Sequence, residues 1–120
     1  MKPFQPRQDP AVKTLARRPA VDPDAMRAAA GNAVGALKVL ANEDRLLLLC
    51  QLSQGEMCVS DLEERLGIGQ PTLSQQLGVL RNEGVVQTRR EGKNVFYRFA
   101  DPALLAIIGV LYRLYCPKDA

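Results

Sequence analysis

The segment from Ile68 to Gly84 constrains the fold most strongly, because both ends of one helix can be recognised in it. Pro71 suits the first position of a helix, where a missing N–H leaves no hydrogen bond unmade. Gly84 suits the left-handed residue that follows a helix end. These signals predict a helix from about Pro71 to Glu83. The helix would bury one apolar stripe at helical spacing, formed by Leu73, Leu77 and Leu80.

The outer face of this predicted helix offers hydrogen bonds and little charge. Its amide, hydroxyl and guanidinium side chains lie mostly outside the leucine stripe: Thr72, Ser74, Gln75, Gln76 and Arg81. Base edges in a DNA major groove present the donors, acceptors and methyl groups that such side chains can read. A polar outer face is also the rule for surface helices, so the helix by itself favours an ordinary surface role. The elements next to this helix must distinguish a DNA-reading role from an ordinary surface role.

Two helices are expected earlier in the chain. An alanine-rich stretch with apolar residues at helical spacing predicts the first from about Asp24 to Leu40, with Asp22 or Asp24 near its cap. Asn42 is a good N-cap for the second helix, which Gly55 ends. The inner face of the second helix is expected to consist of Leu46, Leu49, Cys50 and Ser53. Cys50 is therefore expected to point toward the interior.

A third, short helix is expected to begin at Ser60, because Ser60-Asp61-Leu62-Glu63 has the pattern of a capping box. It would end near Leu66, and a turn containing glycine leads directly to the helix that starts at Pro71. A short helix, a turn and a longer helix with a polar outer face form the helix-turn-helix pattern. The DNA-reading interpretation gains support from this order of elements.

Two β-rich segments, Val85 to Arg90 and Asn94 to Phe99, flank Glu91-Gly92-Lys93 and predict a hairpin. Its core-facing residues are expected to be Val95, Tyr97 and Phe99. Cations near its tip could reach a phosphate backbone or a minor groove. The expected fold is mainly α with a small β-hairpin, a winged helix-turn-helix. The residues predicted to contact double-stranded DNA are Gln70, Thr72, Ser74, Gln75, Gln76, Arg81, Arg89, Arg90 and Lys93.

Asp101-Pro102 is expected to cap a last helix that is apolar nearly all round. Its apolar residues are Leu104, Leu105, Ile107, Ile108, Leu111, Tyr112, Leu114 and Tyr115. A domain of about 100 residues cannot surround such a helix, so we expect a homodimer formed by the last and first helices. Two-fold symmetry would place two DNA-reading helices about 34 Å apart on a near-palindromic operator.

With 120 residues and a hydrophobic share of 47%, the chain has enough apolar side chains for one core. Residues 1 to 22 are expected to form a disordered basic tail, and residues 23 to 117 the domain. The longest apolar runs fall short of the roughly 18 residues that span a bilayer. The start of the chain also lacks the apolar core of a signal peptide. A cytoplasmic protein with no membrane partner is therefore expected.

Two stretches, together with the order of elements, resemble the ArsR/SmtB winged-helix repressors over about residues 30 to 116. They are Gly69-Gln70-Pro71-Thr72-Leu73-Ser74-Gln75-Gln76-Leu77-Gly78-Val79-Leu80-Arg81 and Asn94-Val95-Phe96-Tyr97-Arg98. Within that family the chain is most similar to the dithiol sensors of the BigR, SqrR and HlyU group, because Cys50 and Cys116 end the second and last helices. The resemblance implies a dimeric repressor that leaves its operator when reactive sulfur species or oxidants link these two cysteines.

The chain has 3 cysteines and no histidine, so the imidazole ligands of the family's zinc and nickel sensors are missing, and no metal or cofactor is expected. Arsenic sensors of the family carry Cys-Val-Cys-Asp-Leu-Cys. Here the sequence is Cys58-Val59-Ser60-Asp61-Leu62-Glu63. A metalloid site would have to recruit Cys50 or Cys116, and a repressor that responds to arsenic or another thiophilic metalloid is the alternative function.

Local electrostatics favours a different thiol from the one that the resemblance favours. Cys58 precedes the third helix, whose N-terminus would stabilise a thiolate, whereas a Cys50 on an apolar face usually packs as a small hydrophobe. At Cys116, Arg113 or Lys118 could favour a thiolate, whereas the C-terminus of the last helix opposes one. Cys58 is therefore kept as an accessory thiol. A thiol redox or sulfur-transfer enzyme would lack a Cys-x-x-Cys and a histidine base, so no enzyme is expected. A module that binds only proteins is the third possibility.

Overall fold

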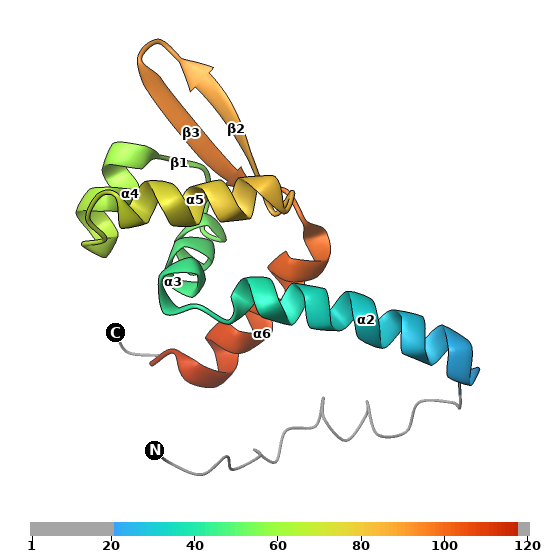
Figure 1. The fold of residues 1–120 in the computed structure, drawn as a ribbon. Coiled ribbons are helices and arrows are strands. Elements are labelled where there is room, and N and C mark those ends of the chain that lie inside the picture. Colours follow the sequence, from blue (N-terminus) through green and yellow to red (C-terminus); the bar gives the residue numbers. More distant parts are fainter. Residues whose placement is uncertain (1–20, 118–120) are drawn as a thin grey trace. The chain divides into compact units, whose positions relative to one another are not determined.

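The computed structural model describes residues 21–117 of the chain. In this part the elements follow the order α2 (Pro23–Leu40), α3 (Glu43–Leu52), β1 (Met57–Cys58), α4 (Val59–Leu66), α5 (Thr72–Asn82), β2 (Val86–Glu91), β3 (Asn94–Phe99) and α6 (Pro102–Tyr115) (Figure 1). Helices α4 and α5 form the helix-turn-helix and β2–β3 the wing, which confirms the predicted winged helix-turn-helix. No helix among the described residues is long and apolar enough to cross a membrane. The expected basic tail lies, except for residues 21 and 22, outside the described residues.

The chain divides into two compact units, residues 1–32 and residues 33–120, and the boundary falls within α2. In the first unit, one carboxylate oxygen of Asp22 accepts hydrogen bonds from the backbone N–H groups of Asp24 and Ala25, both at 3.1 Å. These bonds satisfy two of the donors that a helix N-terminus leaves unpaired. The predicted cap at Asp22 is confirmed.

Caps also start α3 and α6 as predicted. Asn42 Oδ1 accepts a hydrogen bond from the Arg45 N–H at 3.0 Å, at the first turn of α3. Asp101 Oδ1 accepts from the N–H groups of Ala103 and Leu104 at 2.9 and 3.1 Å, with Pro102 at the first position of α6. Short polar side chains at these positions thus fix where two of the helices begin.

The start of α4 differs from the prediction. The helix begins at Val59 with Cys58 as its N-cap residue, and no side chain caps it, so the expected capping box at Ser60 is wrong. The reason is strand β1, which sequence analysis missed because it is only two residues long. Antiparallel pairing of Met57 with Tyr97 and of Cys58 with Phe96 holds the chain extended up to the first residue of α4.

Helix α5 lies one residue inside each predicted end. Gln70 Oε1 accepts from the Ser74 N–H at 3.2 Å and from Ser74 Oγ at 2.7 Å, so the side chain of Gln70 caps the helix while Pro71 occupies the N-cap position. At the other end Gly84 adopts a φ of 72°, which confirms its predicted left-handed conformation. The exit from α5 is fixed by Val85, whose N–H donates to the carbonyl of Leu80 at 3.0 Å.

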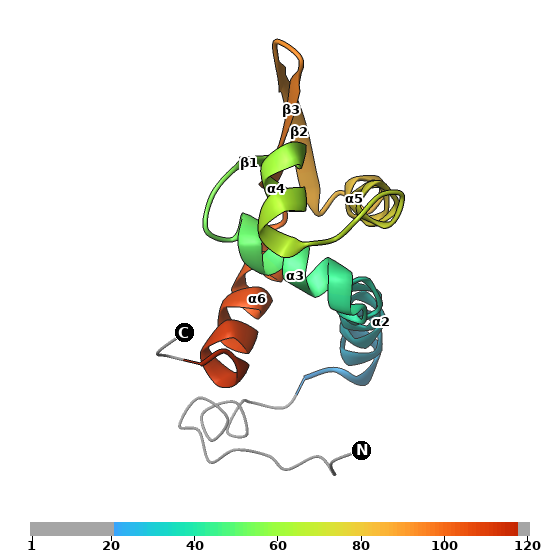
Figure 2. The same ribbon diagram turned by 90° about the vertical axis from the view of Figure 1, so that its left-hand side faces the viewer.

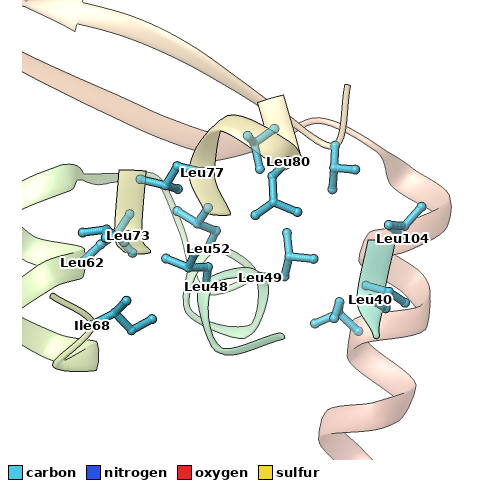
Figure 3. Packing of buried hydrophobic residues seen from close by; sticks show 13 residues of the cluster. Leu40, Leu48, Leu49, Leu52, Leu62, Ile68, Leu73, Leu77, Leu80 and Leu104 are labelled. Carbon is cyan, nitrogen blue, oxygen red and sulfur yellow. The ribbon is translucent and has the colours of Figure 1, made fainter. Parts of the chain in front are cut away.

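The core joins α3, α4 and α5, and Figure 3 shows their leucines facing one another. Leu73, Leu77 and Leu80 are at most 1% exposed, which confirms the predicted stripe. The predicted inner face of α3 is wrong in part. Its fully buried residues are Leu48, Leu49 and Leu52. Leu46 and Cys50 are half-buried against the core, and Ser53 is the C-cap. Helix α3 contacts α4, α5 and α6, so its buried arc faces several elements at once.

The small sheet has the strand order β1-β3-β2, with all pairs antiparallel. The hairpin β2–β3 turns at Gly92, which has a φ of 65°, and it projects beyond α4 and α5 in both views (Figures 1 and 2). The core-facing residues Tyr97 and Phe99 pack against the core as predicted, and Val95 is half-buried. The wing is thus anchored at its base and open to solvent at its tip.

Candidate functional site

The outer face of α5 presents two of the four predicted base-reading side chains to solvent. Ser74 and Gln75 are exposed, whereas Thr72 and Gln76 are half-buried. Arg81, predicted to contact a phosphate or the minor groove, is exposed as well. Gln70 and Ser74 are hydrogen-bonded to each other at the start of the helix. Gln75 is therefore the predicted base reader that lies on the exposed face with no hydrogen bond to another side chain in residues 21–117. An exposed carboxamide of this kind can pair with the edge of an adenine.

The side chain of Gln76 is held by a hydrogen bond from an arginine on α3. Arg45 Nη1 donates to Gln76 Oε1 at 2.9 Å, its Nε donates to the Val39 carbonyl at 2.6 Å, and its Nη2 donates to the Lys38 carbonyl at 3.2 Å. One guanidinium thus ties the last turn of α2 to α5. Sequence analysis missed this contact, because partners 31 positions apart in the chain leave no local pattern.

The wing cations are not equivalent. Arg89, Arg90 and Lys93 are all exposed, but the guanidinium of Arg89 binds the carboxylates of Glu56 and Glu91. Arg81, Arg89 and Arg90 line a hollow of about 320 Å³ where the end of α5 meets the wing. The remaining lining residues are Val59, Thr88, Val95 and Tyr97. The structure therefore brings α5 and wing cations together on one surface, which suits a phosphate backbone.

The structure also brings two of the three thiols into one neighbourhood. Cys50 lies on α3 and Cys116 caps the C-terminus of α6, and these helices contact each other. Partial burial raises the pKa of the Cys50 thiol above its ordinary value of 9.0, and the negative charge of Cys116 raises that pKa further. A charge can act in this way only at short range. Both thiols are free, and each is half-buried.

Cys116 and Cys58 differ in their access to solutes. Cys116 lines a hollow of about 300 Å³ together with Tyr112, Arg113 and Pro117. Cys58 is buried, 8% exposed, and its Sγ lies 3.3 Å from Ser60 Oγ. Within residues 21–117 no group of three or more Cys, Asp, Glu or His side chains is placed to hold a metal ion. Cys116 is therefore more open to solutes than Cys58.

Removing Cys116 is expected to make Cys50 more acidic. In the wild type, alkylation of Cys50 should reach its half-maximal rate above pH 9.0, because burial and the Cys116 charge both oppose the thiolate. In a Cys116→Ser variant the midpoint should move down but stay above 9.0, since burial is the larger cause. Peptide-resolved mass spectrometry after iodoacetamide pulses measures it, with Cys58→Ser as the control. An unchanged midpoint in Cys116→Ser would show that the two thiols are not neighbours.

Comparison with known proteins agrees with the winged helix-turn-helix fold. Residues 42–88 match the family described as bacterial regulatory protein, arsR family. Over 102 residues the chain is 43% identical to the biofilm growth-associated repressor of Xylella fastidiosa strain 9a5c, covering 85% of this chain and 90% of that protein. The chain belongs to the ArsR family.

Solved structures of ArsR-type regulators give the same result. The transcriptional repressor BigR from Xylella fastidiosa is 42% identical, with a TM-score of 0.76 over 82% of this chain and 98% of that one. Reduced HlyU from Vibrio cholerae is 43% identical, with a TM-score of 0.73 over 77% of this chain and 97% of that one. These findings confirm the resemblance to the BigR and HlyU group and the expectation of a DNA-binding transcriptional regulator that is not an enzyme.

Proposed function

We propose that this ArsR-family regulator is a repressor that releases its operator when Cys50 and Cys116 become linked, directly or through added sulfur atoms. The observation that carries the proposal is that Cys50 on α3 and Cys116 at the end of α6 lie on helices that contact each other; the effect of Cys116 on the pKa of Cys50 agrees with this placement. In the direct reaction each thiol gives one electron and one proton to the oxidant. With hydrogen peroxide as the oxidant, a disulfide and two molecules of water are formed. With an organic persulfide, the outer sulfur is transferred to one cysteine and the organic thiol leaves. Attack of the second cysteine on the inner sulfur of this persulfide forms the disulfide and releases hydrogen sulfide. If both cysteines carry an added sulfur, the same attack forms a trisulfide and again releases hydrogen sulfide.

The contacts of α3 give the link a route to the DNA-binding surface. Helix α3 contacts α6, which carries Cys116, and it contacts α5 through the leucine core. A bond that draws α6 onto α3 therefore acts on the element that positions α5. An inducer shifts an equilibrium only if it distinguishes the two states, so the linked form must fit the DNA-bound geometry less well than the reduced form.

Exposed apolar residues support a homodimer. On α6 they are Leu105, Val110, Tyr112 and Tyr115. In the part of α2 that belongs to the second unit, Val34 and Leu37 are 48% and 57% exposed. Apolar patches of this kind mark interaction surfaces. A two-fold dimer would present two copies of α5 to successive major grooves of a near-palindromic, double-stranded operator.

Replacing Gln75 with alanine tests the DNA-reading part of the proposal. Loss of a base contact is expected to cost about 1–3 kcal/mol on the operator and much less on random DNA of the same length. Fluorescence anisotropy titrations at one fixed salt concentration measure both affinities. Gln54→Ala, an exposed glutamine outside α5, is the matched control and should change neither. Equal losses on operator and random DNA would remove Gln75 from base reading.

A metalloid-responsive repressor is the second candidate. It is favoured by the likeness to AntR, described as an antimony-specific transcriptional repressor, which is 32% identical with a TM-score of 0.70 over 92% of this chain and 94% of that one. It is disfavoured by the absence, within residues 21–117, of a cluster of three metal-binding side chains. Thiophilic ions prefer several thiolate ligands, and here Cys58 lies on β1, apart from the pair on α3 and α6.

A further inference from the structure

The guanidinium of Arg89 is engaged on three sides. Its Nε and Nη2 lie 2.8 and 2.6 Å from Glu56 Oε1, and its Nη1 donates to Glu91 Oε2 at 2.7 Å. Its central carbon lies 4.5 Å from the centre of the Phe96 ring, within the range of a cation–π contact. A guanidinium with these partners has few donors left for a DNA phosphate.

The three partners are spread over the small sheet: Glu56 just before β1, Phe96 on β3, and Glu91 on β2, the strand of Arg89 itself. Arg89 on β2 lies opposite Phe96 on β3, and Phe96 lies opposite Cys58 on β1. Glu56 directly precedes β1. The arginine therefore reaches over the ring of the central strand and joins the two outer strands. Because β1 is only two residues long, few backbone hydrogen bonds tie the wing to it, and a side-chain connection matters more there.

The neighbouring cations are placed differently. Arg90 and Lys93 are exposed, and within the described part of the chain neither forms an ion pair with an acidic side chain. Arg90 lines the same hollow as Arg81 and Arg89, so what sets it apart is the absence of a carboxylate partner within residues 21–117. Their charge is open to a phosphate backbone, whereas the charge of Arg89 is balanced by two carboxylates.

We propose that Arg89 positions the wing and does not bind a phosphate. Glu56, Arg89, Phe96 and Glu91 form a wing strut, which fixes the direction of the β2–β3 hairpin relative to α5, while Arg90 and Lys93 contact the DNA backbone. This role rests on the proposed function in DNA binding. It also departs from the expectation, drawn from the sequence, that all three wing cations contact DNA. The Arg89 hydrogen bond lowers the pKa of Glu56, so the strut stays intact at neutral and mildly acidic pH.

Neutralising Glu56 separates the two roles of Arg89 by the sign of the effect. If Arg89 bound a phosphate, Glu56 would compete with the DNA, and Glu56→Gln would strengthen binding. If Arg89 belongs to the strut, Glu56→Gln should weaken operator binding by about two- to fivefold, the range for an exposed ion pair. Glu64→Gln removes the same charge from an exposed position on α4 and is the matched control. Removing an acidic charge alone can only favour DNA, so a weakening is specific to the strut.

The salt dependence of operator binding gives a second readout. Each lost phosphate contact lowers the slope of log K against log salt by about 0.9. Arg90→Gln is expected to lower the slope by about that amount, whereas Arg89→Gln should reduce affinity with an unchanged slope. A slope reduced by one contact in Arg89→Gln would overturn the strut. So would tighter binding by Glu56→Gln than by Glu64→Gln.

Hydrogen exchange tests whether the strut holds the wing in place when no DNA is present. The backbone amides of β2 and β3 should exchange faster in Glu56→Gln than in wild type or Glu64→Gln, while the amides of α3 and α5 stay protected. Unchanged exchange in the wing would overturn the strut whatever the DNA titrations give. If the wild type showed no salt-dependent operator binding, the proposed function in DNA binding would fail. The exchange comparison would then still test whether the strut positions the wing.

Discussion

A Cys50→Ser protein is expected to bind the operator like the reduced wild type and to stay bound after treatment with an organic persulfide or peroxide. Serine is close to cysteine in size but cannot form a sulfur–sulfur bond, and Cys50 is only half-buried, so the fold should tolerate it. The wild type should lose operator affinity roughly 5- to 150-fold on treatment, the usual range for coupling between two sites. Anisotropy titrations before and after treatment measure this difference.

Cys116→Ser should behave like Cys50→Ser, because both thiols are needed for one link. Cys58→Ser is the matched control: the Ser60 hydroxyl, which lies 3.3 Å from the Cys58 sulfur, is in reach of the new hydroxyl. This variant should still release the operator. Release by Cys50→Ser to the same extent as by the wild type would exclude the thiol pair as the switch.

Leu77→Ala is expected to lower the free energy of unfolding by about 2–5 kcal/mol, because it leaves a cavity in a closely packed core. Leu77 is 1% exposed and lies on the face of α5 that meets the leucines of α3 and α4 (Figure 3). A loss of this size is a large part of the roughly 5–15 kcal/mol that stabilises a typical domain. Urea denaturation followed by circular dichroism measures it.

Val79→Ala is the control for Leu77→Ala on the same helix. Val79 is 38% exposed and points away from the core, so its truncation should cost well under about 1 kcal/mol. Because α5 also carries the base-reading face, Leu77→Ala should weaken operator binding as well. Equal, small losses in the two variants would mean that α5 is not anchored by this leucine stripe.

Local signals allowed most helix boundaries to be predicted from the sequence. Asp22, Asn42 and Asp101 are caps whose effect lies within three residues, and Gly84 ends α5 through its own backbone conformation. The start of α4 was mispredicted for a non-local reason, since pairing of Cys58 with Phe96 outweighs a capping-box pattern at Ser60.

The candidate site likewise has features that local sequence signals predict and features that depend on distant contacts. The polar face of α5 could be predicted from helical periodicity, whereas a link between Cys50 and Cys116 stays a prediction that rests on the family resemblance. The contacts that set the geometry of the site could not be predicted. Arg45 with Gln76 and Arg89 with Glu56 join residues 31 and 33 positions apart, and their patterns in the sequence are those of ordinary surface charges.

Mass spectrometry tests the central claim most directly. The operator-bound protein is treated with peroxide, an organic persulfide or arsenite, and the masses of the protein in the bound and released fractions are compared. We expect the released fraction to carry a Cys50–Cys116 link, as a disulfide or with added sulfur atoms. We expect the bound fraction to keep both thiols free. Released protein with no link between these cysteines, or with a bound metalloid in place of the link, would contradict the central claim.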